Sequence, residues 1–301
     1  MEIFDRILGI ILPVFFIIAI GYGYGRVRGA AVKADMIAVN TVSMDALCPL
    51  LVFTALAARD FNLAANASLI AGGALVALGS GLLAWPVARL LGYDMRTFLP
   101  PMMYNNCGNM GLPLAVLAFG PGGLSAAVAM FMACNVVYFT LGIKIIESGG
   151  KQHVSPWAFL KNPMMLAMFA GLFFALLRIP IPAPLFQAMK LLGDASIPIM
   201  LFALGVRMLD IRFDSWKIGV TGAIVCPVAG LLVALGLDHV LVLNAAQRGQ
   251  LFLFASLPPA VFCFMVAERY QQEPDKVASI VMIGNLAALL FVPLGLWLGL
   301  R

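Results

Sequence analysis

The sequence predicts an all-α integral membrane protein with ten transmembrane helices, arranged as two inverted repeats of five helices each. Three observations support this fold class. The 301 residues are 62% hydrophobic and 11% charged, whereas about a quarter of the residues in soluble proteins are charged. Ten apolar windows of about 20 residues follow one another, each long enough to cross a bilayer. Proline, aspartate and asparagine residues within the spans recur in the second half of the chain in the same order as in the first half.

The connections between the predicted spans are too short to form a soluble domain, which excludes a separate catalytic or nucleic-acid-binding module. The spans lie near residues 3–24, 36–57, 66–88, 97–119, 122–145, 158–178, 184–207, 216–237, 247–267 and 277–300. The first span has no small-residue cleavage pattern before Gly21, so it is interpreted as a retained helix rather than a secretory signal. The repeats are expected at residues 1–146 and 158–301, joined by a short cytoplasmic linker at 147–157.

Lys and Arg residues are distributed unequally between the two sides of the predicted bundle. Thirteen of the 19 follow odd-numbered spans, and the six on the other side are Arg6, Arg59, Arg178, Lys190, Arg248 and Arg301. Because cytoplasmic loops carry an excess of Lys and Arg, the side with thirteen is expected to be cytoplasmic. The protein is therefore expected to be a multi-pass protein of the cell (inner or plasma) membrane, with both termini extracytoplasmic.

Four pairs of residues have nearly the same separation in the sequence, from 146 to 150 residues. The pairs are Pro13 and Pro163, Asp45 and Asp194, Pro113 and Pro259, and Asn135 and Asn285. Both aspartates begin the same D-A-x-x-P pattern. Since each repeat has an odd number of spans, the second repeat enters the bilayer from the opposite face. Inverted repeats of this kind are typical of secondary transporters.

The fourth span contains a polar stretch, Asn105–Pro113, that a helix surrounded by lipid could not accommodate. Pro113 has no N–H to donate to the carbonyl of Asn109, and two glycines in the stretch allow the backbone to bend. The predicted result is two half-helices joined by unwound backbone beside Asn105, Asn106 and Asn109. Such backbone persists at membrane depth only where protein buries it or water reaches it. The stretch is interpreted as a solute-binding crossover, with a proline-glycine kink as the alternative.

The ninth span contains the corresponding break. Ser256, Pro258 and Pro259 belong to a Ser-Leu-Pro-Pro sequence, in which two successive prolines each remove a helical hydrogen bond. Asn135 and Asn285 are single amides in the spans that follow the two breaks. Each amide is interpreted either as the partner in an interhelical hydrogen bond or as a residue that lines the solute site.

Two carboxylates are predicted within the membrane, at Asp45 and Asp194. Each aspartate lies four residues before a proline, so the aspartate and its proline share a helix face. The proline has no N–H to donate to the carbonyl of the aspartate, which leaves that carbonyl free. A carboxylate at this depth is costly and is expected to face the bundle or a cavity. Both are candidates for proton or cation coupling. The alternative is a protonated or hydrogen-bonded aspartate that holds the interrupted helix together.

The spans contain no catalytic signature. There is no HExxH or GxSxG motif, and both histidines lie in predicted loops. The five cysteines lie in apolar spans without CxxC spacing, so neither a disulfide framework nor a metal site is expected. The protein is predicted not to be an enzyme and to use no cofactor, with proton or sodium coupling left open.

Three stretches resemble the auxin efflux carrier family, which includes bacterial members and the plant PIN carriers. They are GNMGLPLA at 108–115, LGDASIPIMLFALG at 192–205 and SLPPAVFCFMVAERYQQEPDKVASIVMIGNLAALL at 256–290. The resemblance implies a ten-helix inverted-repeat carrier of organic anions or weak acids, auxin being the plant example, whose broken helices cross at the middle of the membrane. Carried over by motif, Asn109, Pro113 and Pro259 fall on that crossover. The chain lacks the long cytoplasmic insert of many plant members.

The function indicated is secondary active transport of small organic anions, carboxylates or weak acids by alternating access, with export as the favoured direction. A sodium-coupled anion symporter similar to the bile-acid transporters is the alternative, and a channel with a continuous pore is a third class. The expected partners are the organic anion and membrane lipid, without nucleic acid. The sequence leaves the substrate, the coupling ion and homodimer formation open.

Overall fold

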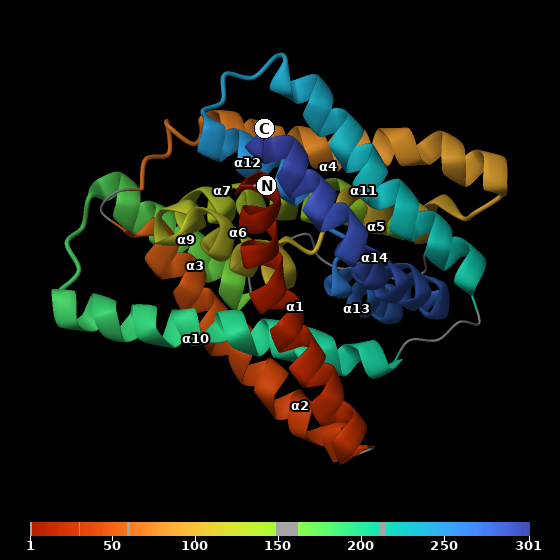
Figure 1. Ribbon diagram of the computed structural model, residues 1–301, viewed down its shortest axis with the longest axis horizontal. Helices are drawn as coiled ribbons and strands as arrows, with labels where there is room; N and C mark the ends of the chain where they lie inside the picture. Colours follow the sequence, from red (N-terminus) through yellow and green to blue (C-terminus); the bar gives the residue numbers. More distant parts are fainter. Residues whose placement is uncertain (1, 30, 59–60, 149–161, 211–214) are drawn as a thin grey trace.

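The computed structural model describes residues 2–29, 31–58, 61–148, 162–210 and 215–301. These residues form a helical bundle whose only β-type pairing is one isolated bridge (Figure 1). Seven helices are long and apolar enough to cross a membrane: Phe4–Arg28, Ala34–Leu56, Ala67–Leu91, Gly122–Glu147, Ala183–Arg207, Trp216–Asp238 and Pro274–Leu300. The all-α membrane class is thus confirmed. Most of the predicted linker at 147–157 lies outside the described residues.

The first half of the chain runs from α1 to α8. Its elements are α1 (Glu2–Arg28), α2 (Ala31–Val42), η1 (Ser43–Leu47), α3 (Cys48–Leu56), α4 (Ala67–Leu91), α5 (Met95–Met103), η2 (Cys107–Gly111), α6 (Leu112–Phe119), α7 (Pro121–Val137), η3 (Tyr138–Gly142) and α8 (Ile143–Glu147). The elements η1, η2 and η3 are π-turns, in which an N–H bonds to the carbonyl five residues earlier. Helix α4 ends at Gly92, whose φ of 68° lies in the left-handed region that suits glycine.

The second half of the chain runs from α9 to α14. Its elements are α9 (Pro163–Leu177), α10 (Ala183–Arg207), the 3₁₀ turn η5 (Met208–Asp210), α11 (Trp216–Asp238), α12 (Ala245–Ala255), α13 (Val261–Tyr270) and α14 (Pro274–Leu300). Polar side chains fix two of the starts. Asn162 accepts a hydrogen bond from the N–H of Met164 at α9, and Asn244 and Gln247 form a reciprocal capping box at α12.

Three of the ten predicted spans are not single long helices in the structure. The sixth falls on α9, which has 15 helical residues. At about 1.5 Å per residue, such a helix is shorter than the hydrocarbon core of about 30 Å. The fourth span falls on α5, η2 and α6, and the ninth falls on α12 and α13. The fourth and ninth spans are the ones relevant to function, because non-helical residues interrupt each of them in the interior of the bundle.

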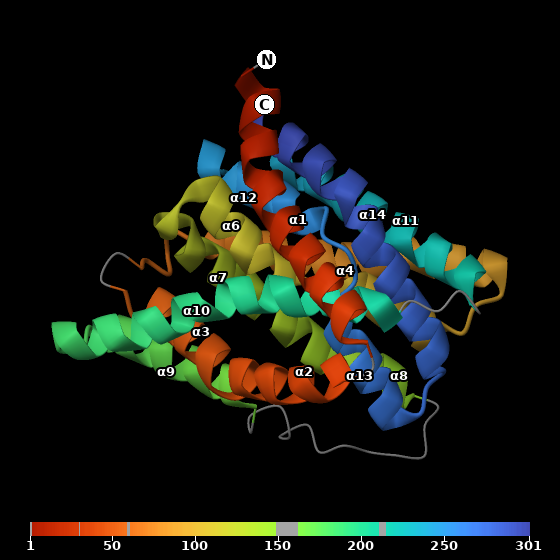
Figure 2. The ribbon, with the colours of Figure 1, turned by 60° about the horizontal axis from the view of Figure 1, so that its bottom comes forward.

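Glycines allow the closest helix crossings. Where α1 meets α10, a Cβ on Gly205 would lie 2.0 Å from the carbonyl oxygen of Ile18, and Figure 2 shows α1 lying across α10. Where α9 meets α3, a Cβ on Gly171 would lie 3.0 Å from the carbonyl oxygen of Phe53. Any larger residue would separate these helices, so the sequence fixes both crossing points through small residues.

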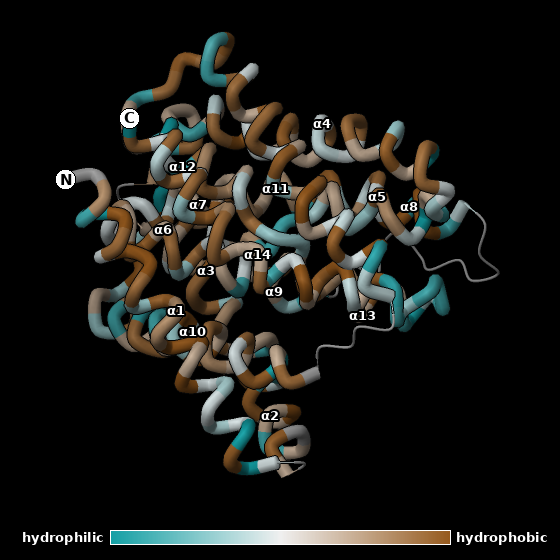
Figure 3. The backbone as a smooth tube through the Cα atoms, turned by 45° about the vertical axis from the view of Figure 1, so that its right-hand side comes forward, coloured by the Kyte–Doolittle hydropathy of each residue, from teal (hydrophilic) through white to brown (hydrophobic). Residues whose placement is uncertain are grey.

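The two chain ends lie close together in both ribbon views (Figures 1 and 2). Hydrophobic residues run along most helices, and hydrophilic residues gather near the ends of α8 and α13 (Figure 3). The ends of α8 and α13 lie away from the chain termini in Figure 2. The bundle therefore has a polar region at the side opposite the termini.

A hydrogen-bonded network on that side joins the start of α5 to the turn between α13 and α14. Gln272 donates from Nε2 to Asp94 Oδ2 (3.1 Å) and to Thr97 Oγ1 (3.0 Å). Thr97 donates from Oγ1 to Glu273 Oε2 (2.6 Å), and Arg96 pairs with Asp94 at 2.7 Å. The network therefore connects the interrupted fourth span, at the start of α5, to the interrupted ninth span, at the end of α13.

The carboxylates of this network make stability depend on pH. Hydrogen bonds from Arg96 lower the pKa of the Asp94 carboxyl. Burial raises the pKa of the Glu273 carboxyl, but hydrogen bonds from Lys276 and Thr97 outweigh burial and leave that pKa lowered. A carboxyl whose pKa is lower in the folded state stabilises the fold above its ordinary pKa, and this stabilisation is lost as the pH falls through the lowered value.

We therefore expect the melting temperature of the purified protein in detergent to fall as the pH is reduced from about 6 to about 3. The double variant Asp94→Asn/Glu273→Gln should melt lower than the wild type at the higher pH and should lose less stability over the interval. Thermal melting of both proteins across the range checks this. Parallel pH profiles would assign the acid sensitivity to other carboxylates.

Candidate functional site

Two non-helical segments meet in the interior of the bundle. Tyr104–Asn106 separates α5 from η2, and Ser256–Ala260 separates α12 from α13. The segments lie antiparallel, with an isolated bridge between Asn105 and Pro259. We call this pair of segments the crossing. It brings together residues about 150 positions apart in the sequence.

Backbone groups of the crossing are paired from one segment to the other. The N–H of Asn106 donates to the carbonyl of Pro258 (2.7 Å), and the N–H of Ala260 donates to the carbonyl of Tyr104 (2.9 Å). Within hydrocarbon, each unpaired backbone group costs on the order of several kcal/mol. Because each segment supplies partners that the other needs, the two breaks stabilise one another.

Side chains complete the pairing at the end of α12. Asn105 donates from Nδ2 to the carbonyl of Phe254 (2.7 Å), and Ser256 donates from Oγ to the carbonyl of Leu253 (2.7 Å). Both side chains are buried, Asn105 being 5% exposed and Ser256 fully enclosed. Pro258 cannot donate to the carbonyl of Phe254 four residues earlier, so Asn105 replaces that helical donor, while the carbonyls of Phe254 and Leu253 also accept the N–H groups of Leu257 (3.3 Å) and Ser256 (3.2 Å).

Asn135 and Asn285 occupy equivalent places on the two sides of the crossing. Tyr104 donates from its hydroxyl to Asn135 Oδ1 (2.7 Å), and Asn106 donates from Nδ2 to Asn285 Oδ1 (3.0 Å). Each of the two asparagines also donates to the carbonyl four residues earlier in its own helix. The structure therefore brings Asn135 and Asn285 against the crossing as interhelical hydrogen-bond partners, and Tyr104 is a contact that the sequence reasoning missed.

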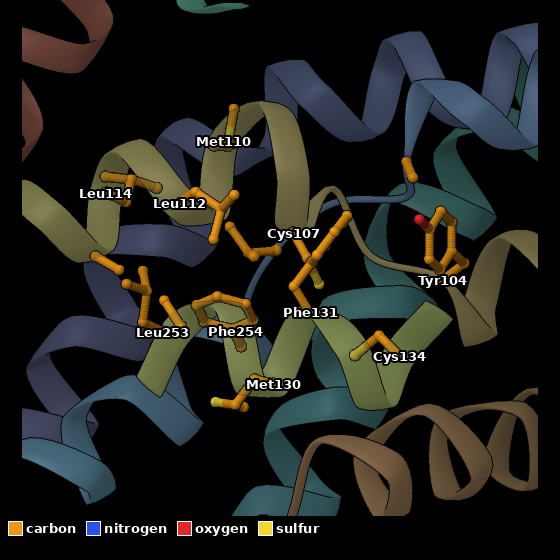
Figure 4. Packing of buried hydrophobic residues seen from close by; sticks show 14 of the residues in the cluster. Tyr104, Cys107, Met110, Leu112, Leu114, Met130, Phe131, Cys134, Leu253 and Phe254 are labelled. Carbon is orange, nitrogen blue, oxygen red and sulfur yellow. The ribbon is translucent and has the colours of Figure 1, made fainter. Parts of the chain in front are cut away.

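Apolar side chains surround the crossing. Figure 4 shows Tyr104, Cys107, Phe131 and Phe254 packed around it. The ring of Tyr104 stacks on that of Tyr138, with centroids 4.3 Å apart. With this packing the crossing is closed to solvent in the conformation described.

The break in the fourth span lies earlier in the sequence than expected. The backbone is helical from Cys107 to Phe119, so Pro113 does not interrupt it, and Pro113 directly follows the π-turn η2. The N–H of Leu112 bonds to the carbonyl of Cys107, five residues earlier, so the π-turn continues directly into α6. The unwound residues are Tyr104–Asn106, and they owe their form to the paired segment rather than to Pro113.

Asn109 lies apart from the other asparagines of its stretch. It is half-buried in η2 and borders a pocket of about 10 Å³, together with Asn40, Ser43 and Arg207. This pocket lies between η2 and the elements α2, η1 and α10. Of the residues proposed from the sequence, Asn105, Asn106, Pro258 and Pro259 meet at the crossing, whereas Asn109 faces a different set of helices.

The two predicted intramembrane carboxylates lie in different surroundings. Asp194 lines a cavity, but its carboxylate also pairs with Lys190 Nζ at 2.6 Å, and its side chain is 44% exposed. Asp45 lies in η1 and is exposed. Asp194 thus faces a cavity, as expected of a carboxylate at this depth, whereas Asp45 does not lie against one in the described structure. The spacing of Lys190 and Asp194, four residues apart on one helix, could have indicated their pairing.

The cavity beside Asp194 is large, with a volume of about 2090 Å³. It opens between α3, α4, α7, α9 and α10, and much of its lining is apolar, including Phe61, Ile70, Val116, Leu124, Phe174 and Ile197. The charged residues among its described lining are Arg178, Lys190 and Asp194. The sequence reasoning used the two cations only to orient the chain in the membrane.

The chain is similar to known transporters along nearly its whole length. An uncharacterised transporter of Methanothermobacter thermautotrophicus is 25% identical over 94% of this chain and 95% of its own length. A Rhizobium meliloti protein, whose name gives malonate transport as a proposed activity, is 26% identical over 93% of this chain and 92% of its own length. A family model described as membrane transport protein matches residues 6–296. The chain therefore belongs to this membrane transport protein family, the family of the auxin efflux carriers.

Proposed function

We propose that the protein is a secondary active transporter of small organic anions, with solute bound near the crossing and access alternating between the two sides of the membrane. The crossing is the observation that carries the proposal. Non-helical backbone at membrane depth is characteristic of transporter binding sites. The helical stretches that begin after the crossing, η2–α6 and α13, direct the positive ends of their dipoles toward it, which favours an anion.

The order of the helices supports two inverted repeats at 1–146 and 158–301. The elements correspond in order: α1 with α9, α2–η1–α3 with α10, α4 with α11, α5–η2–α6 with α12–α13, and α7–η3–α8 with α14. Their contacts are reciprocal, since α1 packs on α10 while α9 packs on α3. Exchange of conformation between two such repeats would convert an outward-open state to an inward-open one.

The two sides of the bundle differ in the size of their cavities. The cavity of about 2090 Å³ lies beside Asn62 and Arg178, in the connections that precede α4 and α10. On the other side, the pocket at Asn109 has a volume of only about 10 Å³. The excess of Lys and Arg on the opposite side favours an extracytoplasmic location for the first side and for both termini. Because the crossing itself is enclosed, this asymmetry supports a conformation of a plasma-membrane carrier in which the outer side is open as far as the cavity and the solute site is occluded.

A carboxylate is the proposed solute class, and export is the proposed direction. The dipoles at the crossing favour an anion, and the name of the Rhizobium meliloti relative proposes malonate as its solute. Flux of labelled mono- and dicarboxylates into proteoliposomes tests the proposal. Replacement of sodium by choline and a separate change of pH distinguish sodium from proton coupling. Absence of carboxylate flux under every gradient would overturn the proposed function.

Asn109 is proposed to bind the solute as the inner side opens. Its half-buried amide lies in η2, close to the end of the helix dipole. Asn109→Ala should weaken carboxylate affinity by about 10-fold, near the low end for a hydrogen bond to a charged group because the site is partly solvated. Asn109→Asp should weaken it further through like-charge repulsion. Wild-type affinity in both variants would remove Asn109 from the site.

A further inference from the structure

We propose that the large cavity contains a second anion site, separate from the crossing, where Lys190 binds a carboxylate solute and Asp194 is the resident counter-ion that the solute displaces. The proposal rests on the proposed function for the identity of the solute as a carboxylate. It gives the Lys190–Asp194 pair a role in solute entry or exit instead of proton coupling.

The pair faces the cavity. Lys190 Nζ and Asp194 Oδ2 are 2.6 Å apart, their side chains are 46% and 44% exposed, and both residues line the cavity together with Ile197 and Pro198 one turn further along α10. Within the described parts of the chain, the side-chain hydrogen bond to the Asp194 carboxylate comes from Lys190. The remaining protons of the Lys190 ammonium and the remaining lone pairs of the Asp194 carboxylate are therefore available to a solute in the cavity.

The depth of the pair indicates that the cavity holds water. Lys190 is seven residues beyond Ala183, the first residue of α10, which corresponds to about 10 Å along the helix axis, and Asp194 lies about 6 Å further. Charged groups at such depth are costly unless they face a water-filled space or a partner. An aqueous cavity that reaches the pair is also a route by which a dissolved anion reaches it.

The described lining carries an excess of positive charge. Arg178 lines the same cavity and makes no ion pair with any residue in the described ranges. It closes α9 in the left-handed conformation, with φ of 52°, where glycine is the usual residue. Two cations and one carboxylate leave one positive charge for a solute anion.

Exchange of partners at Lys190 follows from the strength of the pair. A half-exposed ion pair four residues apart on one helix is only weakly favourable. A lysine ammonium has three donors, and Asp194 uses one of them in the closest contact. A carboxylate that enters the cavity can therefore replace Asp194 on Lys190 at little cost, because the displaced Asp194 carboxylate is half-exposed and is then solvated by the cavity water.

The test measures binding of labelled malonate to the purified full-length protein in nanodiscs. Lys190→Gln should weaken binding by about 5-fold, because it removes the ammonium. Asp194→Asn should strengthen binding by about 2- to 5-fold, because it removes the competing carboxylate. The double variant should bind like Lys190→Gln. These opposite signs are not expected of a pair that only stabilises α10, since both single variants would then lower the melting temperature and leave affinity unchanged.

Asp35→Asn is the matched control. The Arg28–Asp35 pair has the same separation of 2.6 Å and nearly the same exposure, 49% and 42%, but lies at the turn between α1 and α2. Its loss should not change malonate binding. Wild-type protein that binds no malonate, or variants that bind as the wild type does, would overturn the second site. Lys190-dependent binding without flux into proteoliposomes would instead overturn the proposed transport function and leave the site standing.

Discussion

Replacement of Gly230 by alanine is expected to abolish transport and to destabilise the protein strongly. Gly230 lies in α11 where this helix meets the end of α12, and a Cβ there would lie 2.1 Å from the carbonyl oxygen of Ala255 and 3.0 Å from its carbonyl carbon. Backbone atoms cannot rotate away as a side chain can. The helices must separate, at a cost of roughly 3 kcal/mol or more.

The position of the clash decides its effect on function. Ala255 is the last residue of α12, immediately before Ser256, so displacement of its carbonyl moves the crossing itself. The hydrogen bond from Asn105 to the neighbouring carbonyl of Phe254, 2.7 Å long, would be lost with it. Transport should therefore fall further than the loss of folded protein alone explains.

Gly236→Ala is the control on the same helix. A Cβ at Gly236 would have no neighbour within 4 Å, and alanine favours a helix over glycine by about 1 kcal/mol. This variant should be as stable as the wild type or slightly more stable. The five buried cysteines become reactive toward a thiol dye on unfolding, which gives the melting temperature of each variant. Equal melting temperatures for the two variants would show that α11 can move without disturbing α12.

The sequence predicted the class of the protein and the second half of the crossing better than the first half. Apolar windows define the helices, and Ser256–Pro259 marks a break because successive prolines remove helical hydrogen bonds whatever their surroundings. Pro113 misled the prediction, since the π-turn before it continues directly into α6 without a break. The actual break at Tyr104–Asn106 depends on the carbonyl of Pro258, a partner about 150 residues away that no local pattern reveals.

The charged residues of the cavity also show that a local sequence pattern does not reveal tertiary surroundings. The sequence made Asp194 a candidate coupling residue because a carboxylate in an apolar span is rare. Whether its side chain is buried depends, however, on which helices leave a space beside it. That space is bordered by α3, α4, α7 and α9, which come together only in the folded bundle. The partner Lys190 was visible in the sequence, four residues earlier, and its pairing required no tertiary information.

Asn105→Ala is expected to have the second large effect. Its Nδ2 is the side-chain donor to the carbonyl of Phe254 at 2.7 Å, and the asparagine is only 5% exposed. Removal leaves this carbonyl with the longer bond from the N–H of Leu257 (3.3 Å), so the expected cost is that of one hydrogen bond, roughly 1 kcal/mol, or about 5-fold in a folding equilibrium. Asn105→Leu keeps most of the volume and also removes the donor, so it separates the hydrogen bond from the packing.

The matched control is Asn66→Ala, because Asn66 also donates from Nδ2 to a backbone carbonyl, that of Asn62 at 2.8 Å, but in an exposed loop. Water replaces a donor there, so this variant should melt within a few degrees of the wild type. Asn105→Ala and Asn105→Leu should both melt lower and transport less. If only the alanine variant is impaired, then the side chain acts through its volume. If both retain wild-type melting and flux, then the backbone pairing between Tyr104–Asn106 and Ser256–Ala260 holds the crossing without help from Asn105, and the hydrogen bond to Phe254 is dispensable.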